Sequence, residues 1–217
     1  MGSRRLILCL QSQAASLRTI YKTMSLTMNG KNPLILDYKN RIRSYFSRKA
    51  SWGERLMLEG AFLDIENLFR NQYRLSGKPV VVHSLRVAAL LCQVGADFRS
   101  VIAGLLHDTL EDTHLTKEEI RQGYGKWVAG MSESLKKTQN QEQTHQKLLQ
   151  AGHHDIRSLK IKFCDRLDNM REIQWLTPYK RHRISRESLQ FYLPFSAAIG
   201  IPSDKRDELE SLAARFL

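Results

Sequence analysis

The apolar residues of this chain recur at the spacing of α-helices. In the segment after residue 51 they fall three or four positions apart, as the buried face of a helix requires. Similar patterns predict helices over about 83–94, over 98–105, and in a long segment from Ile156 to Met170. The run Val80–Val82 has no second run with which to pair as a strand, so we interpret it as the entry to the helix at 83–94. The sequence therefore predicts an all-α fold, a helical bundle.

Residues typical of helix ends support these boundaries. Residues 51–54 (Ser-Trp-Gly-Glu) and 116–119 (Thr-Lys-Glu-Glu) have the pattern of a capping box. Asp97 is placed to cap the helix that runs to 105, and Thr177 precedes a proline of the kind favoured at the first helical position. The stretch 139–150 is polar and rich in glutamine, and we expect it to be a loop or a poorly held helix.

The composition fits one globular domain. The chain has 217 residues, of which 42% are hydrophobic, enough for one sizeable core. Its unbroken apolar runs are far shorter than the roughly 20 residues of a membrane-spanning helix. The three cysteines include no C-x-x-C pair, which argues against a disulfide framework and against a thiolate zinc site. We therefore expect a soluble protein of the cytoplasm, with no membrane partner.

Positive charge is concentrated near the N-terminus. The chain has a net charge of +12, which favours phosphate-bearing partners, and residues 1–36 include five basic residues and no acidic one. We expect this segment to be separate from a domain at 37–217. It is a disordered basic tail, an organellar targeting segment, or the product of a start codon assigned too early, with Met24 or Met28 as the true first residue.

The dipeptide of His107 and Asp108 is a candidate metal-binding element. It offers an imidazole nitrogen and a carboxylate oxygen, which are ligands of cations that activate water. A second His-Asp pair occurs at 154–155, so the dipeptide alone is weak evidence. At His107 and Asp108, however, Glu111 and Asp112 follow, four residues after His107 and Asp108 respectively. If the helix continues or bends only slightly, these four groups gather at the end of an apolar helix. Charged groups at such a place are costly unless a cation or another partner compensates them.

Two further candidate ligands lie on other predicted helices. His83 faces apolar residues at helical spacing, and Asp165 interrupts an apolar face. Taken singly, His83 is more simply explained as a core histidine bonded to a carbonyl group, and Asp165 as the partner of Arg166 or of a lysine. The combination of these groups on three helices favours a shared metal site.

Longer stretches extend this pattern. They are 72–79 (Gln-Tyr-Arg-Leu-Ser-Gly-Lys-Pro) with His83, 107–113 (His-Asp-Thr-Leu-Glu-Asp-Thr), 155–157 (Asp-Ile-Arg), 161–171 (Ile-Lys-Phe-Cys-Asp-Arg-Leu-Asp-Asn-Met-Arg), 183–189 and 199–201. In order and spacing they resemble the HD-domain hydrolases of the RelA/SpoT homologue group, specifically the stand-alone small alarmone hydrolases. The resemblance covers about residues 60–201 and implies an HD-domain helical bundle.

The resemblance also implies a reaction and a set of site residues. Such enzymes hydrolyse the 3′-pyrophosphate of ppGpp or pppGpp to pyrophosphate and GDP or GTP. It implies one Mn²⁺ ion bound by His83, His107, Asp108 and Asp165. It assigns Glu111 and Asp112 to the handling of water and protons. It places near the nucleotide or its phosphates the residues Arg74, Ser76, Lys162, Asn169 and Arg171.

The chain departs from the family pattern without losing a proposed ligand. Asp168 replaces a common histidine, Glu172 a common threonine, and Leu75 a usual basic residue. These changes alter the pocket and leave the substrate preference open. The alternatives are the same chemistry on the 2′-phosphate of NADPH, on ppApp, or on tRNA with a pyrophosphorylated 3′ end, in which case the protein is an antitoxin. A third hypothesis is an inactive HD fold that binds nucleotide.

Two further expectations concern the rest of the chain. It ends soon after the HD-like segment, so we expect hydrolysis without synthesis of the alarmone. Lys136, Lys137 and the basic residues at 180–183 are typical of solvated helix faces, although so much positive charge also suits an RNA-bearing substrate. The oligomeric state is not predicted.

Overall fold

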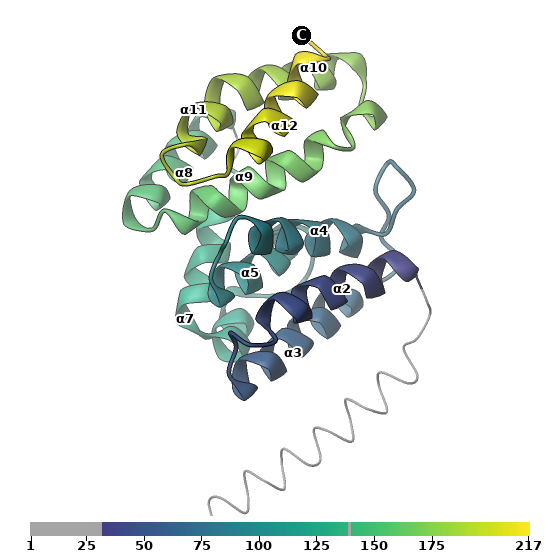
Figure 1. Ribbon diagram of the computed structural model, residues 1–217, viewed down its shortest axis with the longest axis vertical. Coiled ribbons are helices and arrows are strands. Elements are labelled where there is room, and N and C mark those ends of the chain that lie inside the picture. Colours follow the sequence, from purple (N-terminus) through teal and green to yellow (C-terminus); the bar gives the residue numbers. More distant parts are fainter. Residues whose placement is uncertain (1–31, 139) are drawn as a thin grey trace, which may run out of the picture. The chain divides into compact units, whose positions relative to one another are not determined.

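A computed structural model of the chain describes residues 32–138 and 140–217, and the part that it describes is helical (Figure 1). The α-helices are α2 (Pro33–Phe46), α3 (Trp52–Leu68), α4 (Val80–Gln93), α5 (Phe98–Leu105), α6 (Thr109–Asp112), α7 (Lys117–Leu135), α8 (Gln141–His154), α9 (Arg157–Met170), α10 (Pro178–Glu187), α11 (Leu193–Ser196) and α12 (Ser203–Ala214). A 3-10 helix, η1 (Ile173–Trp175), and a π-helix, η2 (Ser188–Tyr192), complete them. Extended pairing within these residues is limited to one bridge between Tyr73 and Pro79. The predicted all-α fold is confirmed.

The predicted helix starts are formed by side-chain caps. Ser51 and Thr116 each accept a hydrogen bond from the backbone N–H three residues on, and the glutamate at that position bonds back to complete a capping box. The side chains of Asp97 and Thr177 likewise accept a hydrogen bond from the backbone N–H three residues on, at the starts of α5 and α10, without a reciprocal bond. Each cap satisfies a backbone donor that the first turn of a helix leaves unpaired.

The structure makes two predicted elements more definite. The run Val80–Val82, interpreted as the entry to a helix, is the first turn of α4, which begins directly after Pro79 and buries Val81 and Val82. Of the two alternatives for the glutamine-rich segment, a loop or a poorly held helix, the structure shows a helix, α8, which Asn140 caps and Leu148 anchors in the core.

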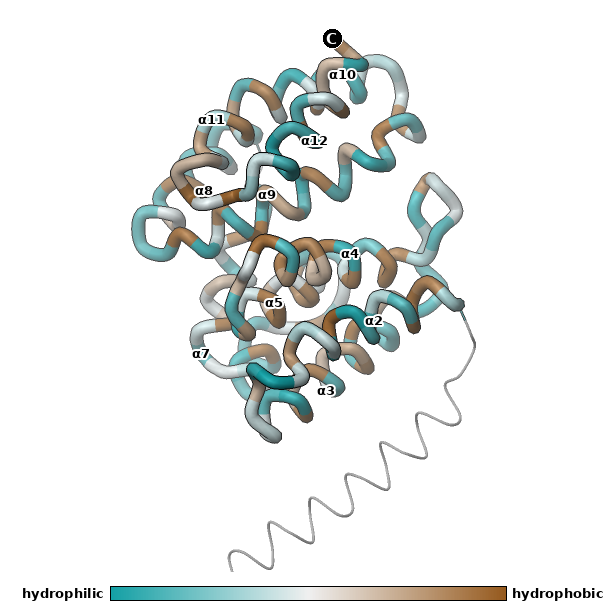
Figure 2. Tube along the Cα trace, viewed as in Figure 1, coloured by the Kyte–Doolittle hydropathy of each residue, from teal (hydrophilic) through white to brown (hydrophobic). Residues whose placement is uncertain are grey.

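Helix α4 forms the centre of the domain. It packs against α3, α5 and α9, and every residue from Val81 to Cys92 is buried. Figure 2 shows hydrophobic residues concentrated on α4 and α5, whereas α12 is mostly hydrophilic. A helix buried on all sides leaves its polar residues no water, so they need partners inside the protein.

The chain turns between α5 and α6, where the sequence left open whether the helix continues or bends. Helix α5 ends at Leu105, and α6 begins at Thr109 after a short turn. The turn is held by Thr109, whose N–H and hydroxyl both bond to the carbonyl oxygen of Leu106. His107 and Asp108 therefore project from a turn, facing α4 and α9.

Residues 1–31 and 139 lie outside the described residues, so most of the predicted basic segment is not covered by the structure. Helix α2 begins at Pro33 and crosses the predicted boundary between residues 36 and 37, which stays a prediction. Among the described helices, none combines the length and the apolar character that crossing a bilayer requires.

Candidate metal centre and adjoining pocket

Four side chains from three parts of the fold converge at one point. His83 comes from α4, His107 and Asp108 from the turn before α6, and Asp165 from α9. The ligand atoms of the first three lie within 4.8 Å of one another. Oδ1 of Asp165 lies 3.3 Å from Nε2 of His83 and 3.7 Å from Nε2 of His107. The four residues that the sequence predicts as metal ligands are thus brought together.

The buried imidazole of His107 indicates what this cluster suits. Its Nδ1 lies 2.8 Å from the carbonyl oxygen of Gly104, to which Nδ1–H donates, so Nε2 presents a lone pair. Nε2 has no hydrogen-bond partner among the described residues, although it lies 3.0 Å from Oδ2 of Asp108. Two lone pairs at this distance in a buried site repel unless a proton or a cation lies near both. The residues therefore fit a divalent cation with nitrogen and oxygen ligands.

The electrostatics of the cluster favour added positive charge. Burial disfavours a charged imidazole, yet the surrounding aspartates raise the pKa of His83 to about 10 and the pKa of His107 to about 9. Burial likewise disfavours charged carboxylates, yet the histidines, and for Asp165 first of all Lys162, hold the pKa of Asp108 and of Asp165 well below the usual range. Without a cation, protons on the imidazoles balance the negative charge of the aspartates. A bound cation would balance the same negative charge.

The acidic pair Glu111 and Asp112 lies in α6, one turn beyond the cluster. The backbone N–H groups of both residues bond to the carbonyl oxygen of Asp108. Glu111 accepts hydrogen bonds from the backbone N–H and from Nζ of Lys137. The pKa of Asp112 is raised, first by burial and then by the charge of Asp108. A carboxylate with a raised pKa accepts a proton more readily than an ordinary aspartate does.

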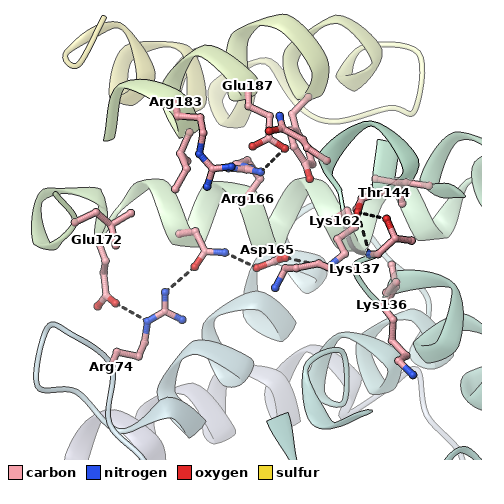
Figure 3. Close-up of a pocket in the computed structure, with 18 of the residues that line it drawn as sticks. Arg74, Lys136, Lys137, Thr144, Lys162, Asp165, Arg166, Glu172, Arg183 and Glu187 are labelled. Atoms are coloured by element: carbon pink, nitrogen blue, oxygen red, sulfur yellow. Dashed lines mark hydrogen bonds and ion pairs between the residues drawn. The ribbon is translucent and has the colours of Figure 1, made fainter. Parts of the chain in front are cut away.

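A cavity of about 670 Å³ adjoins the cluster through Asp165. Figure 3 shows Arg74 and Glu172 at one end and Lys137 and Lys162 at the other, with Asp165 between them. Apolar side chains complete its wall, including Leu148, Trp175, Leu176, Ile184 and Tyr192. Charged groups at defined places beside an apolar wall are typical of a small-molecule site.

Most of the predicted substrate-binding residues line this cavity. Arg74, Ser76, Lys162 and Asn169 do so. Arg171 does not, because it lies at the C-terminal end of α9 and points to another face, where it pairs with Glu208 of α12.

The direction of Lys137 was not predicted from the sequence. Its side chain is 64% exposed, in keeping with the predicted solvated face, but the side chains of Lys136 and Lys137 point in different directions. Figure 3 shows Lys137 reaching toward Asp165 while the ammonium group of Lys136 points away. The charges of Asp108, Asp165 and Glu111 raise the pKa of Lys137, although its side chain is largely exposed. Nothing in the local sequence distinguishes these neighbouring lysines.

Comparison with known proteins identifies the family. The family model of the HD domain matches residues 61–202. The chain belongs to the HD domain family. The His-Asp pair that projects from the turn before α6 therefore lies within an HD domain, and the resemblance found in the sequence is confirmed.

Curated relatives share this HD domain. The chain is 38% identical over 152 residues to a guanosine-3′,5′-bis(diphosphate) 3′-pyrophosphohydrolase of Aquifex aeolicus, covering 67% of this chain and 22% of that protein. It is 37% identical over 169 residues to the bifunctional (p)ppGpp synthase/hydrolase SpoT of Escherichia coli, covering 74% of this chain and 24% of that protein. The chain thus spans about a quarter of the length of these relatives.

A solved structure has the same fold as this HD domain. It is described as a metazoan orthologue of SpoT that hydrolyses ppGpp. The TM-score is 0.58 at 21% sequence identity, and the match covers 76% of this chain and 96% of that one. At this identity the likeness concerns the fold.

Proposed function

We propose that this HD domain hydrolyses the 3′-pyrophosphate of ppGpp or pppGpp with the help of Mn²⁺. The observation that carries the proposal is the convergence of His83, His107, Asp108 and Asp165 beside a cationic cavity. The reaction is the one named for the Aquifex aeolicus relative.

The four converging side chains would hold the cation. When bound there, a divalent cation polarises a phosphoryl oxygen and lowers the pKa of a water molecule. A cation that takes six ligands, as Mn²⁺ does, would have positions left for substrate and water beside these two imidazoles and two carboxylates. Manganese accepts this mixed set of ligands.

The two ends of the cavity have different parts in substrate binding. Lys137 and Lys162 hold the 3′-pyrophosphate next to Asp165, where their charge also stabilises the negative charge that grows on the phosphoryl oxygens. Arg74 and Asn169 contact the nucleoside at the other end, against the apolar wall. This arrangement places the bond to be broken close to the cation site.

The acidic pair handles the protons. Water attacks the phosphorus atom joined to O3′, the bond between phosphorus and O3′ breaks, and pyrophosphate leaves. Asp112 takes the proton that the attacking water loses, and a proton is returned to O3′ to form the hydroxyl group. Glu111, fixed by Lys137, orients the water. The raised pKa of Asp112 supports its role as the base.

One assay tests the substrate and the reaction. Purified protein with Mn²⁺ is offered ppGpp, ppApp, NADPH and tRNA with a pyrophosphorylated 3′ end in parallel, and released pyrophosphate and phosphate are measured. We expect pyrophosphate from ppGpp and its loss on addition of EDTA. If another of these substrates is turned over faster than ppGpp, the metal-dependent hydrolysis stands and ppGpp is rejected as the substrate. If none of them is turned over, the proposed function is rejected.

A further inference from the structure

A chain of buried charged groups runs behind His83. Nδ1 of His83 lies 2.6 Å from Oδ2 of Asp168, and the guanidinium of Arg86 lies 2.8 Å and 3.0 Å from the two oxygens of that carboxylate. Arg86 also donates to Oε1 of Glu172 at 2.9 Å. Nε of Arg74 lies 3.0 Å from Oε2 of Glu172. Asp168 is fully buried, and Arg86 and Glu172 are nearly so.

The chain of contacts closes on itself through the pocket. Nη2 of Arg74 donates to Oδ1 of Asn169 at 2.6 Å, and Nδ2 of Asn169 donates to Oδ1 of Asp165 at 2.6 Å. The same oxygen of Asp165 lies 3.3 Å from Nε2 of His83. These contacts join the candidate metal centre to the nucleotide end of the cavity by two routes. We call the closed series of side chains the polar circuit, and its members are His83, Asp168, Arg86, Glu172, Arg74, Asn169 and Asp165.

The buried half of the polar circuit has no part in the reaction as described. Buried ion pairs add little net stability compared with well-packed apolar residues, but they fix the positions of the groups that they join. A role in positioning therefore explains the circuit better than a role in stability.

We propose that Asp168, Arg86 and Glu172 are positioning residues that hold the imidazole of His83 and the guanidinium of Arg74 together, so that the cation site and the nucleotide pocket share one buried support. The inference rests on the proposed function, because it takes His83 as a ligand and Arg74 as a substrate contact.

At the cation site, the contact with Asp168 selects the tautomer of His83. A proton on Nδ1 is bonded to Asp168, which leaves the lone pair of Nε2 directed toward Asp108 and Asp165. Carboxylate partners of this kind orient histidine ligands and increase their basicity. Arg86 balances the charge of Asp168 and keeps its carboxylate from turning away.

At the pocket, Glu172 fixes Arg74 from behind. Its carboxylate accepts from Arg86 and Lys78, and it pairs with Nε of Arg74. Arg74 is thereby held with its remaining N–H groups directed along the cavity wall, and less side-chain entropy is lost when substrate binds. Arg86 contacts the carboxylates of both Asp168 and Glu172. Its loss therefore affects both the cation site and the nucleotide end of the cavity.

The inference is tested by measuring two affinities separately. Mn²⁺ binding is titrated by calorimetry without nucleotide, and ppGpp binding is measured by calorimetry in EDTA, so neither readout depends on turnover. The variants are Asp168→Asn, Glu172→Gln and Arg86→Lys. Lysine keeps one charge but lacks the fork that reaches both carboxylates. Asp155→Asn is the matched control, because it removes an aspartate paired with an arginine, Arg157, outside the circuit.

We expect a specific pattern. Asp168→Asn weakens Mn²⁺ binding about 10- to 100-fold and ppGpp binding much less, because the amide loses the charged partner of His83. Glu172→Gln weakens ppGpp binding about tenfold and Mn²⁺ binding much less. Arg86→Lys weakens both, and Asp155→Asn changes neither. Circular dichroism establishes that each variant is folded, and if Arg86→Lys is not, the first two variants decide.

Two outcomes separate this inference from the proposed function. If the unaltered protein binds Mn²⁺ and hydrolyses ppGpp, but folded Arg86→Lys binds both ligands as tightly, or Asp168→Asn and Glu172→Gln bind like the control, the shared support is rejected and the proposed function stands. If the unaltered protein binds no Mn²⁺, both are rejected.

Discussion

The backbone N–H of Lys137 donates a 2.7 Å hydrogen bond to Oε1 of Glu111, and its ammonium group lies 3.3 Å from Oε2 of the same carboxylate. This double contact joins the segment after α7 to the short helix α6. It fixes the carboxylate of Glu111 in position. It also places the positive charge of Lys137 near Asp108 and Asp165, whose negative charges raise the pKa of Lys137.

Replacing Lys137 is expected to impair catalysis more than replacing its neighbour. Lys137→Met removes a cation that stabilises charge on the phosphoryl oxygens and leaves Glu111 only its hydrogen bond from the backbone N–H at position 137, so kcat/KM for ppGpp should fall about a hundredfold. Lys136→Met, which removes an ammonium group pointing away from Asp165, should cost much less. Steady-state release of pyrophosphate measures both, and equal losses would contradict the assignment of Lys137.

The two His-Asp pairs of the chain are expected to differ completely. Asp108→Ala removes a proposed ligand, and activity should fall by several powers of ten. Asp155→Asn breaks contacts with Arg157 and Trp127 instead, so it should lower the thermal midpoint and leave kcat near that of the unaltered protein. Turnover and thermal unfolding of each variant give the comparison, and normal turnover by Asp108→Ala would reject the site.

Cation binding is expected to stabilise the fold. A ligand that binds only the native state at a hundred times its Kd adds about 2.7 kcal/mol, or about 5–10 °C in Tm for a domain of this size. Mn²⁺ should raise the Tm of the unaltered protein and not that of Asp108→Ala. Thermal unfolding in EDTA and in Mn²⁺ measures this, and an equal rise in both proteins would place the bound ion elsewhere.

Acid is expected to remove the contribution of Glu172 to stability. Although burial opposes its charge, Arg86, Lys78 and Arg74 lower the pKa of Glu172 to about 2 from an ordinary value of 4.5. A depressed carboxyl pKa stabilises the native state above pH 4.5, and this stabilisation is lost as the pH falls from 4.5 toward 2. The loss should be roughly 1 kcal/mol by pH 4.

Urea unfolding of the unaltered protein and Glu172→Gln at pH 7 and at pH 4 tests this expectation. The difference in unfolding free energy between the two proteins should narrow at pH 4, because glutamine does not titrate. A difference that stays constant or widens would contradict the charged contacts assigned to Glu172.

The sequence predicted the features that depend on local chemistry. The caps at Ser51 and Thr116 need only residues three positions apart, so the pattern alone located them. The four side chains that converge were predicted as a set because imidazoles and carboxylates interrupt apolar faces at the spacing of the family that the sequence resembles, and their role as ligands stays a prediction. The run Val80–Val82 was interpreted as the entry to a helix because no second run could pair with it as a strand, and it forms the first turn of α4.

Features that depend on contacts between distant segments could not be predicted. Lys136 and Lys137 are equivalent in sequence, and only the path of the chain after α7 directs one of them toward Asp165. Arg86 lies on an apolar helix, and its partners, Asp168 in α9 and Glu172 directly before η1, are more than 80 residues away in the sequence. Arg171 matches a family position, yet its side chain pairs with Glu208 on another face.

The central claim is that one divalent cation, held by the converging histidines and aspartates, enables this domain to hydrolyse ppGpp. The most direct test strips the protein of metal, titrates it with Mn²⁺ and records the release of pyrophosphate from ppGpp. The account predicts no release in the stripped protein and activity that saturates at one bound ion per chain. Undiminished release without metal, or none at saturating Mn²⁺, would contradict it.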